Sequence, residues 1–231
     1  MKNILVLNYE FPPIWWWASP VSYDISKWYV DLWYNVDVIT MWYKNLPEYE
    51  KVDWINIYRV KCLRTKKQVC HPWEQLTYLY SWYKKAKELL KTKKYDICHV
   101  HFIIPTWVLA LKLKEKYWFK YIITVHGSDV LGHNPRFSLL YRILKNPWKK
   151  IINNSEKIIS PSKYLKEKID NIYWNNEKVI VIPNWILKDK FKPLSKEKYI
   201  LTVSRLQKSK WIQKLVDGSS SEWKGNPCWL L

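Results

Sequence analysis

The sequence predicts an α/β fold, a mostly parallel Rossmann-like sheet with helices on both faces. Short apolar runs such as Ile4–Leu7 alternate along the chain with segments of helical periodicity, as in a parallel sheet with helical crossovers. The candidate strands are 4–8, 35–40, 55–60, 95–101, 120–125, 157–160, 178–182 and 199–203. The candidate helices are 20–33, 73–91, 105–117, 136–153, 161–171 and 210–217. Ligands of such sheets bind at the carboxyl ends of the strands.

The helix and strand pattern divides the 231 residues unevenly. Residues 1–183 form one complete domain, and the polar segment 184–196, flanked by Pro183, is predicted to be a linker. Residues 197–218 supply only the first strand and helix of a second domain. Residues 219–231 have no periodicity, so we expect a truncated or frameshifted end there.

The composition indicates the partners and the compartment. The formal net charge of +19 favours anionic partners, namely phosphate groups, acidic lipid headgroups or nucleic acid, although a lysine-rich bias of an AT-rich genome explains it equally well. A basic amphipathic helix over 136–150 is expected to pack on the domain, with contact to an anionic membrane as the alternative. The chain lacks a long apolar span, a signal peptide and a C-x-x-C pair, which predicts a reduced cytoplasmic protein, with peripheral membrane contact as an option.

The loop from Asn8 to Pro20 is expected to organise the site. It joins the first strand to a helix, and backbone N–H groups at a helix N-terminus form a cradle for anions. Such a loop usually contains glycine, because glycine lets the backbone turn and approach a phosphate closely. Here the central positions are Trp15, Trp16 and Trp17.

Tryptophan and glycine are unusually distributed along the chain, with 17 Trp and only 4 Gly. Trp33 follows a predicted helix as a C′ glycine would, Trp54 follows Asp53 as in an Asp-Gly turn, and Trp185 follows Pro-Asn. Twelve tryptophans stand where glycine is expected or tolerated: 15, 16, 17, 28, 33, 42, 54, 107, 118, 174, 185 and 211. We hypothesise that these are glycine codons read as Trp, as when UGA is translated with the wrong table. The alternative is a chain that is genuinely rich in Trp.

Five motifs in register give a family resemblance. They are E-F-P-P-I-W-W-W-A-S at 10–19, Y-D-I-C-H-V-H at 95–101, I-T-V-H-G-S-D at 123–129, V-I-P-N-W at 181–185, and S-R-L with K-W at 204–211. With glycine in place of the suspect tryptophans, this series resembles family 4 glycosyltransferases of the GT-B fold over about residues 1–218. One departure is Leu187, where the family usually has Asp.

The resemblance implies a retaining glycosyltransferase that moves a sugar from a nucleotide-diphosphate sugar to a lipid-linked or polysaccharide acceptor, without a cofactor or bound metal. In that interpretation, the donor phosphates are bound by Trp15, Trp16, Trp17, Arg205 and Lys210. His126 is the catalytic contact with the transferred sugar. Further acceptor or sugar contacts are Glu10, Ser19, Gly127 and Asp129, although Asp129 could instead cap the next turn.

Two further expectations concern the histidine pair and the activity. We expect His99 and His101 to point to opposite faces of their strand, so that at most one of them reaches the site. The short second domain lacks the paired glutamates that hold the donor in the family, and three indoles block the phosphate cradle. We therefore expect the chain as written to be an inactive fragment.

Two other classes of function compete with this interpretation. A nicotinamide-binding Rossmann enzyme needs G-x-G-x-x-G and an acidic residue ending the second strand, and this strand ends with Ile39-Thr40-Met41. The second alternative is a non-enzymatic basic α/β module that binds an anionic membrane surface or nucleic acid. No RNA-binding or zinc-finger signature accompanies the charge, which makes nucleic acid an unlikely partner.

Overall fold

The computed structural model forms two compact units, Met1–Trp185 and Ile186–Leu231. It describes residues 1–14, 18–67, 70–103, 107–117, 120–127, 129–130, 138–172, 177–184 and 214, without the side chains of 72, 107–110 and 138–144. All of these except residue 214 belong to the first unit. The predicted linker beyond Asn184, the predicted elements of the second domain and the tail lie outside the described residues, Lys214 excepted.

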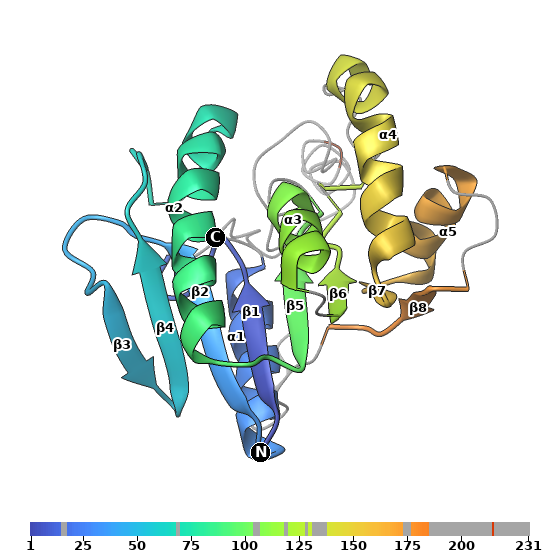
Figure 1. The fold of residues 1–231 in the computed structure, drawn as a ribbon. Helices are drawn as coiled ribbons and strands as arrows, with labels where there is room; N and C mark the ends of the chain where they lie inside the picture. The colour runs from blue at the N-terminus through green and yellow to red at the C-terminus, as the bar shows by residue number, and fades with distance from the viewer. Residues whose placement is uncertain are drawn as a thin grey trace, which may run out of the picture. The chain divides into compact units, whose positions relative to one another are not determined.

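An eight-stranded sheet forms the centre of the first unit, in the order β3-β4-β2-β1-β5-β6-β7-β8 (Figure 1). Its strands are β1 (Asn3–Leu7), β2 (Asn35–Met41), β3 (Tyr49–Val52), β4 (Ile55–Val60), β5 (Ile97–His101), β6 (Lys120–Thr124), β7 (Lys157–Ser160) and β8 (Val179–Val181). All neighbours pair in parallel except β3, which is antiparallel to β4.

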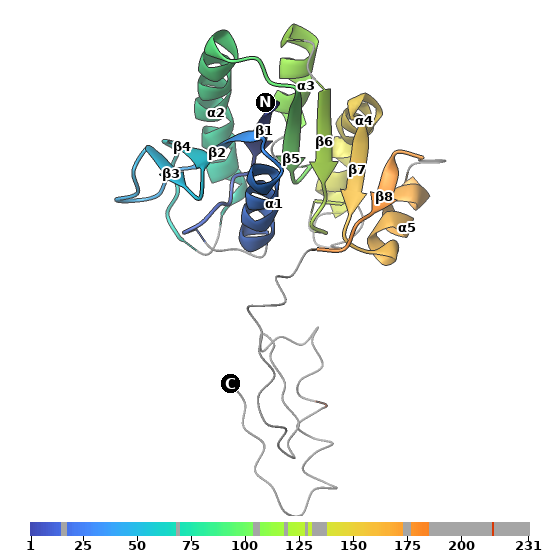
Figure 2. The same ribbon diagram turned by 90° about the horizontal axis from the view of Figure 1, so that it is seen from below.

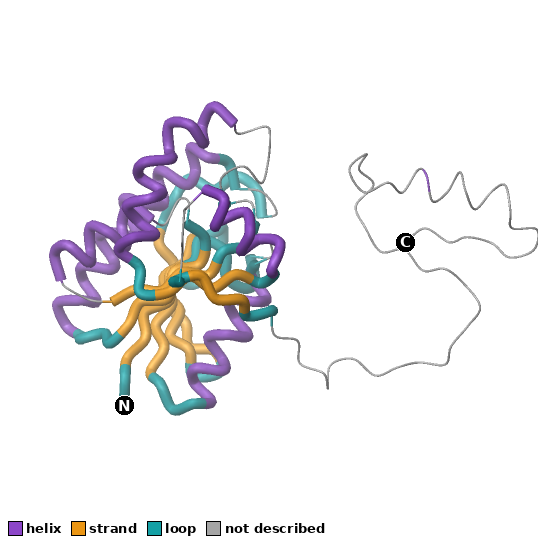
Figure 3. Tube along the Cα trace, turned by 90° about the vertical axis from the view of Figure 1, so that its right-hand side faces the viewer, coloured by secondary structure: helices purple, strands orange, loops and turns teal. Residues whose placement is uncertain are grey.

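Helices cover both faces of this sheet, as predicted. They are α1 (Ser19–Asp31), α2 (Pro72–Thr92), α3 (Trp107–Tyr117), α4 (Ser138–Asn154) and α5 (Lys163–Ile172). Figure 2 shows α2, α3 and α4 on one side of the sheet and α1 on the other. The strands in Figure 3 accordingly lie between layers of helices.

The two faces of β1 enter two different apolar cores, because alternate residues of a strand point to opposite sides. Ile4 and Val6 pack in the smaller core, against which Tyr29 of α1 packs. Leu5 and Leu7 belong to the larger core, which includes Trp82 of α2. Both faces are thus buried, which explains why these strands read as continuous apolar runs.

The observed elements agree with the predicted ones to within two residues at each end wherever both can be compared. The exception is β3, which was missed because Tyr-Glu-Lys-Val is short, polar and exposed at the edge. It forms a hairpin with β4 through Asp53 and Trp54, whose φ angles are 46° and 64°. Two positive φ angles define a type I′ turn, so the Asp-Gly-like turn predicted at Trp54 is confirmed.

Candidate functional site

Loops from three neighbouring strands meet at the carboxyl edge of the sheet. Tyr9 follows β1, Phe102 follows β5, and His126 follows β6. The rings of Tyr9 and Phe102 are 4.8 Å apart between centroids, and those of Phe102 and His126 are 4.5 Å apart. The order β1-β5-β6 in the sheet therefore brings the loop after β1 close to His126.

The loop after β1 is tied to the start of α1 by Asn8. Its side-chain amide donates a hydrogen bond to Ser22 Oγ at 2.8 Å, and its Oδ1 accepts one from the backbone N–H of Glu10 at 3.0 Å. Among the described residues, helix α1 begins after Ala18 without a side-chain cap. Pro20 in its first turn has no backbone N–H, and the N–H of Ser22 already bonds the carbonyl of Ala18 at 2.9 Å. The predicted cradle residues Trp15, Trp16 and Trp17 lie outside the described residues.

Glu10 and Ser19 flank this cradle, and both are buried. In the described structure, Glu10 Oε2 and Ser19 Oγ are buried atoms without a hydrogen-bond partner. Burial raises the pKa of Glu10 to about 8, against the opposing effect of Arg64. At pH 7 the Glu10 carboxyl is therefore mostly neutral, so it can hydrogen-bond a hydroxyl without repelling a nearby phosphate.

His126 is a partly buried, neutral imidazole two residues after the end of β6. Burial, and to a smaller extent the nearby His99, lowers the pKa of His126 to about 3. A neutral ring offers one N–H donor and one acceptor nitrogen. Phe102, which packs on it, has a left-handed φ of 69°, and unusual backbone angles in non-glycine residues are concentrated at functional sites.

The expectation that His99 and His101 point to opposite faces is wrong. Residues two apart on a strand share a face, and these rings are stacked with centroids 4.4 Å apart. His101 Nδ1 lies 3.1 Å from Nε2 of His126. His99 is held between the Tyr29 hydroxyl at 3.0 Å and Thr124 Oγ1 at 2.7 Å. The three histidines therefore form one row of rings.

The buried Asp129 fastens the loop that carries His126. Its Oδ1 accepts a hydrogen bond from the backbone N–H of His126 at 2.9 Å, and its Oδ2 accepts one from Ile103 at 2.8 Å. Gly127, with φ 97°, makes the turn between them. This geometry is that of a loop cap, and contact of Asp129 or Gly127 with an acceptor stays a prediction.

The sequence reasoning missed Tyr9 and Phe102, the two aromatic rings that join the loops. Both follow strands directly, and that position was the available signal. Arg205 and Lys210 lie outside the described residues. In the part of the chain that is described, no group of three or more His, Cys, Asp and Glu side chains could hold a metal ion. That the chain works without a metal or cofactor stays a prediction.

Comparison with known proteins shows which family and which fold this chain is similar to. The model of Glycosyltransferase Family 4 matches residues 18–189. The uncharacterised glycosyltransferases MJ1178 and MJ1607 of Methanocaldococcus jannaschii are 33% and 29% identical, over 49% and 79% of this chain. The aligned parts are 30% and 50% of those proteins, so the chain spans at most half the length of these relatives.

Solved structures share the fold at lower identity. Sucrose-phosphate synthase of Thermosynechococcus elongatus has a TM-score of 0.69 and 14% identity, over 84% of this chain and 51% of its own. HepE of Anabaena, in complex with UDP and glucose, has a TM-score of 0.56 and 18% identity, over 93% and 50%. The fold is thus that of GT-B glycosyltransferases. Since the family model covers most of the sequence, the chain belongs to glycosyltransferase family 4.

Proposed function

We propose that this chain is the acceptor-side half of a retaining glycosyltransferase, which transfers a hexose from a nucleotide-diphosphate sugar to a lipid-linked or polysaccharide acceptor. The observation that carries the proposal is the meeting of the β1–α1 loop with His126 at one edge of the sheet, in a family 4 chain. A nucleotide-sugar donor is supported by HepE of Anabaena, which was solved with UDP-glucose.

The residues at this edge suit the chemistry of sugar transfer. Charge develops on the departing diphosphate, and the positive end of the α1 dipole would stabilise it. Arg205 and Lys210 would add positive charge. His126, kept neutral, would hydrogen-bond a sugar hydroxyl, and the neutral Glu10 would do the same from the other loop. No step in this scheme uses a metal or cofactor.

We also propose that glycine belongs at 15–17 and at several other tryptophan positions. Support comes from Trp33 and Trp54, both at φ 64°, a left-handed conformation that is uncommon for a bulky residue. Trp28 gives no such support, because it lies inside helix α1. Indoles at 15–17 would block the approach of a phosphate, and we therefore expect the chain as written to be inactive.

The test is to sequence the genomic DNA across codons 15–17 and past codon 218, and to express the full reading frame that it gives with glycine at 15–17. Binding and transfer are then measured with a panel of nucleotide-diphosphate sugars. We expect the full reading frame with glycine at 15–17 to bind a nucleotide sugar and to lose that binding on the further change His126→Ala. We expect no binding by the chain as written. The product's anomeric configuration, read by NMR, checks retention. UGG codons at 15–17 in the genomic DNA, or a glycine variant that binds no nucleotide sugar, would overturn the proposal.

A second role, contact with an anionic membrane surface, is favoured by helix α2. Its outward side carries apolar residues in the first half and lysines in the second: Trp73, Leu76, Tyr80, Lys84, Lys87 and Lys91. A helix with aromatic and basic side chains on one side suits a headgroup layer. The basic helix over 136–150, which was expected to pack on the domain with membrane contact as the alternative, overlaps α4, of which the side chains of 138–144 are not described.

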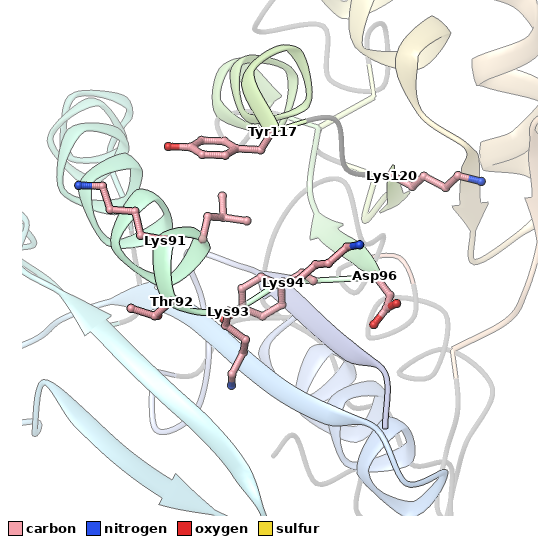
Figure 4. A pocket seen from close by; sticks show the side chains of 9 residues that line it. Lys91, Thr92, Lys93, Lys94, Asp96, Tyr117 and Lys120 are labelled. Carbon is pink, nitrogen blue, oxygen red and sulfur yellow. The ribbon is translucent and has the colours of Figure 1, made fainter.

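Two hollows extend this surface. One, of about 530 Å³, lies along α2 and is lined by Tyr80, Tyr83, Lys84, Lys87, Glu88 and Lys91. The other, of about 510 Å³, lies where α2 and α3 end and β5 and β6 begin (Figure 4). Its lining includes Lys91, Lys93, Lys94 and Lys120.

Among the described residues, no helix is long and apolar enough to cross a membrane. A cytoplasmic location stays a prediction.

Sedimentation with vesicles tests the membrane role. We expect the chain to bind vesicles containing phosphatidylglycerol more than pure phosphatidylcholine, and to lose that preference when Lys84, Lys87 and Lys91 become Glu. The matched control makes the same change at Lys163, Lys166 and Lys168 of α5, with equal loss of charge. If both variants lose vesicle binding equally, the binding depends on net charge alone and the α2 surface has no special role. If the chain binds RNA and no vesicles, a nucleic-acid-binding module is favoured instead.

A further inference from the structure

We propose that His101 is a positioning residue that fixes the tautomer and the ring orientation of His126. This inference rests on the proposed function, in which His126 contacts the sugar, and it adds a residue to that site. Its basis is the contact between His101 Nδ1 and His126 Nε2 at 3.1 Å, with the two rings nearly parallel at 18° and their centroids 5.3 Å apart.

His101 is well placed to act as a fixed support. It is the last residue of β5, pairs in register with Thr124 of β6, and is fully buried. Its ring stacks on His99, and His99 is itself held from two sides by Tyr29 and Thr124. The orientation of the His101 ring is therefore set by the sheet and by its neighbours before any ligand arrives.

A hydrogen bond between two imidazole nitrogens needs one proton donor and one acceptor. Burial lowers the pKa of His101 well below its usual value, and His126 is likewise neutral at pH 7, so each ring carries one proton. If His101 donates from Nδ1, the proton of His126 must lie on its own Nδ1. If His126 donates from Nε2, its Nδ1 is an acceptor. In both cases the tautomer of His126 is coupled to that of His101, and with it the group that His126 offers to a sugar hydroxyl.

The packing around His126 leaves the ring little freedom to escape this contact. Phe102 lies against it with centroids 4.5 Å apart, and Asp129 holds its backbone N–H. A ring flip would break the bond to His101 and place a C–H group against Nδ1. We therefore expect His126 to hold a single tautomer in solution, even without a ligand.

The experiment is ¹⁵N NMR of the full chain labelled at histidine. The expected result is a scalar coupling between His101 Nδ1 and His126 Nε2, with His126 shifts typical of one tautomer. The variant His101→Phe keeps a stacking ring but has no nitrogen, and should average the His126 shifts between tautomers. His101→Asn, which restores a polar atom near the position of Nδ1, should return them toward one tautomer.

Tyr29→Phe serves as the matched control, because it removes one hydroxyl from His99 and leaves the His101–His126 contact in place. It should change the His126 shifts far less than His101→Phe does, because Thr124 still holds His99 at 2.7 Å. Averaged His126 shifts in the unaltered chain, or unchanged shifts in His101→Phe, would overturn the inference. If His101→Phe fails to fold, the test rests on the His126 shifts of His101→Asn and on the scalar coupling between His101 Nδ1 and His126 Nε2 in the unaltered chain. If the full reading frame with glycine at 15–17 also shows a fixed His126 tautomer, and no nucleotide sugar changes the His126 shifts, the positioning role stands and the proposed function is contradicted.

Discussion

Replacing Trp33 by glycine is expected to stabilise the protein. Helix α1 ends in a Schellman motif, in which the N–H of Tyr34 bonds the carbonyl of Tyr29 at 3.0 Å and the N–H of Trp33 bonds that of Val30 at 2.9 Å. The rings of Tyr29 and Tyr34 make the accompanying contact, with centroids 6.3 Å apart. Trp33 is the C′ residue of this motif, with φ 64°, the position at which glycine is preferred.

The size of the effect depends on three contributions. The left-handed conformation costs a residue with a side chain about 1–2 kcal/mol. Little burial is lost, since Trp33 is 79% exposed. Glycine increases the entropy of the unfolded chain, which costs about 0.5–1 kcal/mol. The net gain is roughly 0.5–1 kcal/mol, which corresponds to a rise of about 0.3–0.5 M in the urea midpoint when the slope is about 2 kcal/mol per M.

Urea unfolding followed by circular dichroism measures this shift, and two other tryptophans serve as controls. Trp28→Gly lies within α1 and should destabilise the protein by about 1 kcal/mol, the usual cost of glycine in a helix. Trp54→Gly relieves the same strain but removes the Lys51 ammonium–indole contact at 4.3 Å, worth about 0.5–1 kcal/mol, so its gain should be smaller. A lower midpoint for Trp33→Gly, or a gain for Trp28→Gly, would refute the reasoning.

Three further predictions concern buried acids. Burial raises the pKa of Glu10 in the folded protein to about 8, so between pH 4.5 and 8 the folded state binds a proton that the unfolded state has lost. The free energy of unfolding should therefore fall by roughly 1.4 kcal/mol per pH unit over that range. Glu10→Gln should therefore match the parent at pH 4 and exceed its urea midpoint at pH 8. Asp129→Asn leaves the N–H of Ile103 or His126 without an acceptor and should cost about 1–3 kcal/mol in urea unfolding. Asp37→Ala should cost about 3 kcal/mol in a thermal melt, because this buried carboxylate pairs with a lysine.

The fold was predictable because it depends on local patterns. Apolar runs and helical periodicity set the elements, and their alternation sets the parallel sheet. Edge strand β3 escaped detection because it buries no continuous apolar side, as its exposed Tyr49 and Val52 illustrate. The placement of His126 after a strand was likewise readable. The aromatic contact of Tyr9 with Phe102 was not, because it joins loops 93 residues apart and depends on which strands become neighbours.

Four tryptophans differ in environment in a way that bears on the glycine hypothesis, although Trp28, a suspect inside α1, and Trp73, which is exposed and not a suspect, do not follow the same division. Trp82 and Trp148, which the sequence did not place among the suspects, are fully buried, and the indole of Trp148 donates to the carbonyl of Asp129 at 3.3 Å. Their bulk fills the core, so glycine there would leave a cavity and cost several kcal/mol. Trp33 and Trp54 are exposed and have backbone angles that favour glycine. A chain in which every tryptophan was selected as such would show no reason for this division, whereas a mixture of true tryptophan and misread glycine codons predicts it.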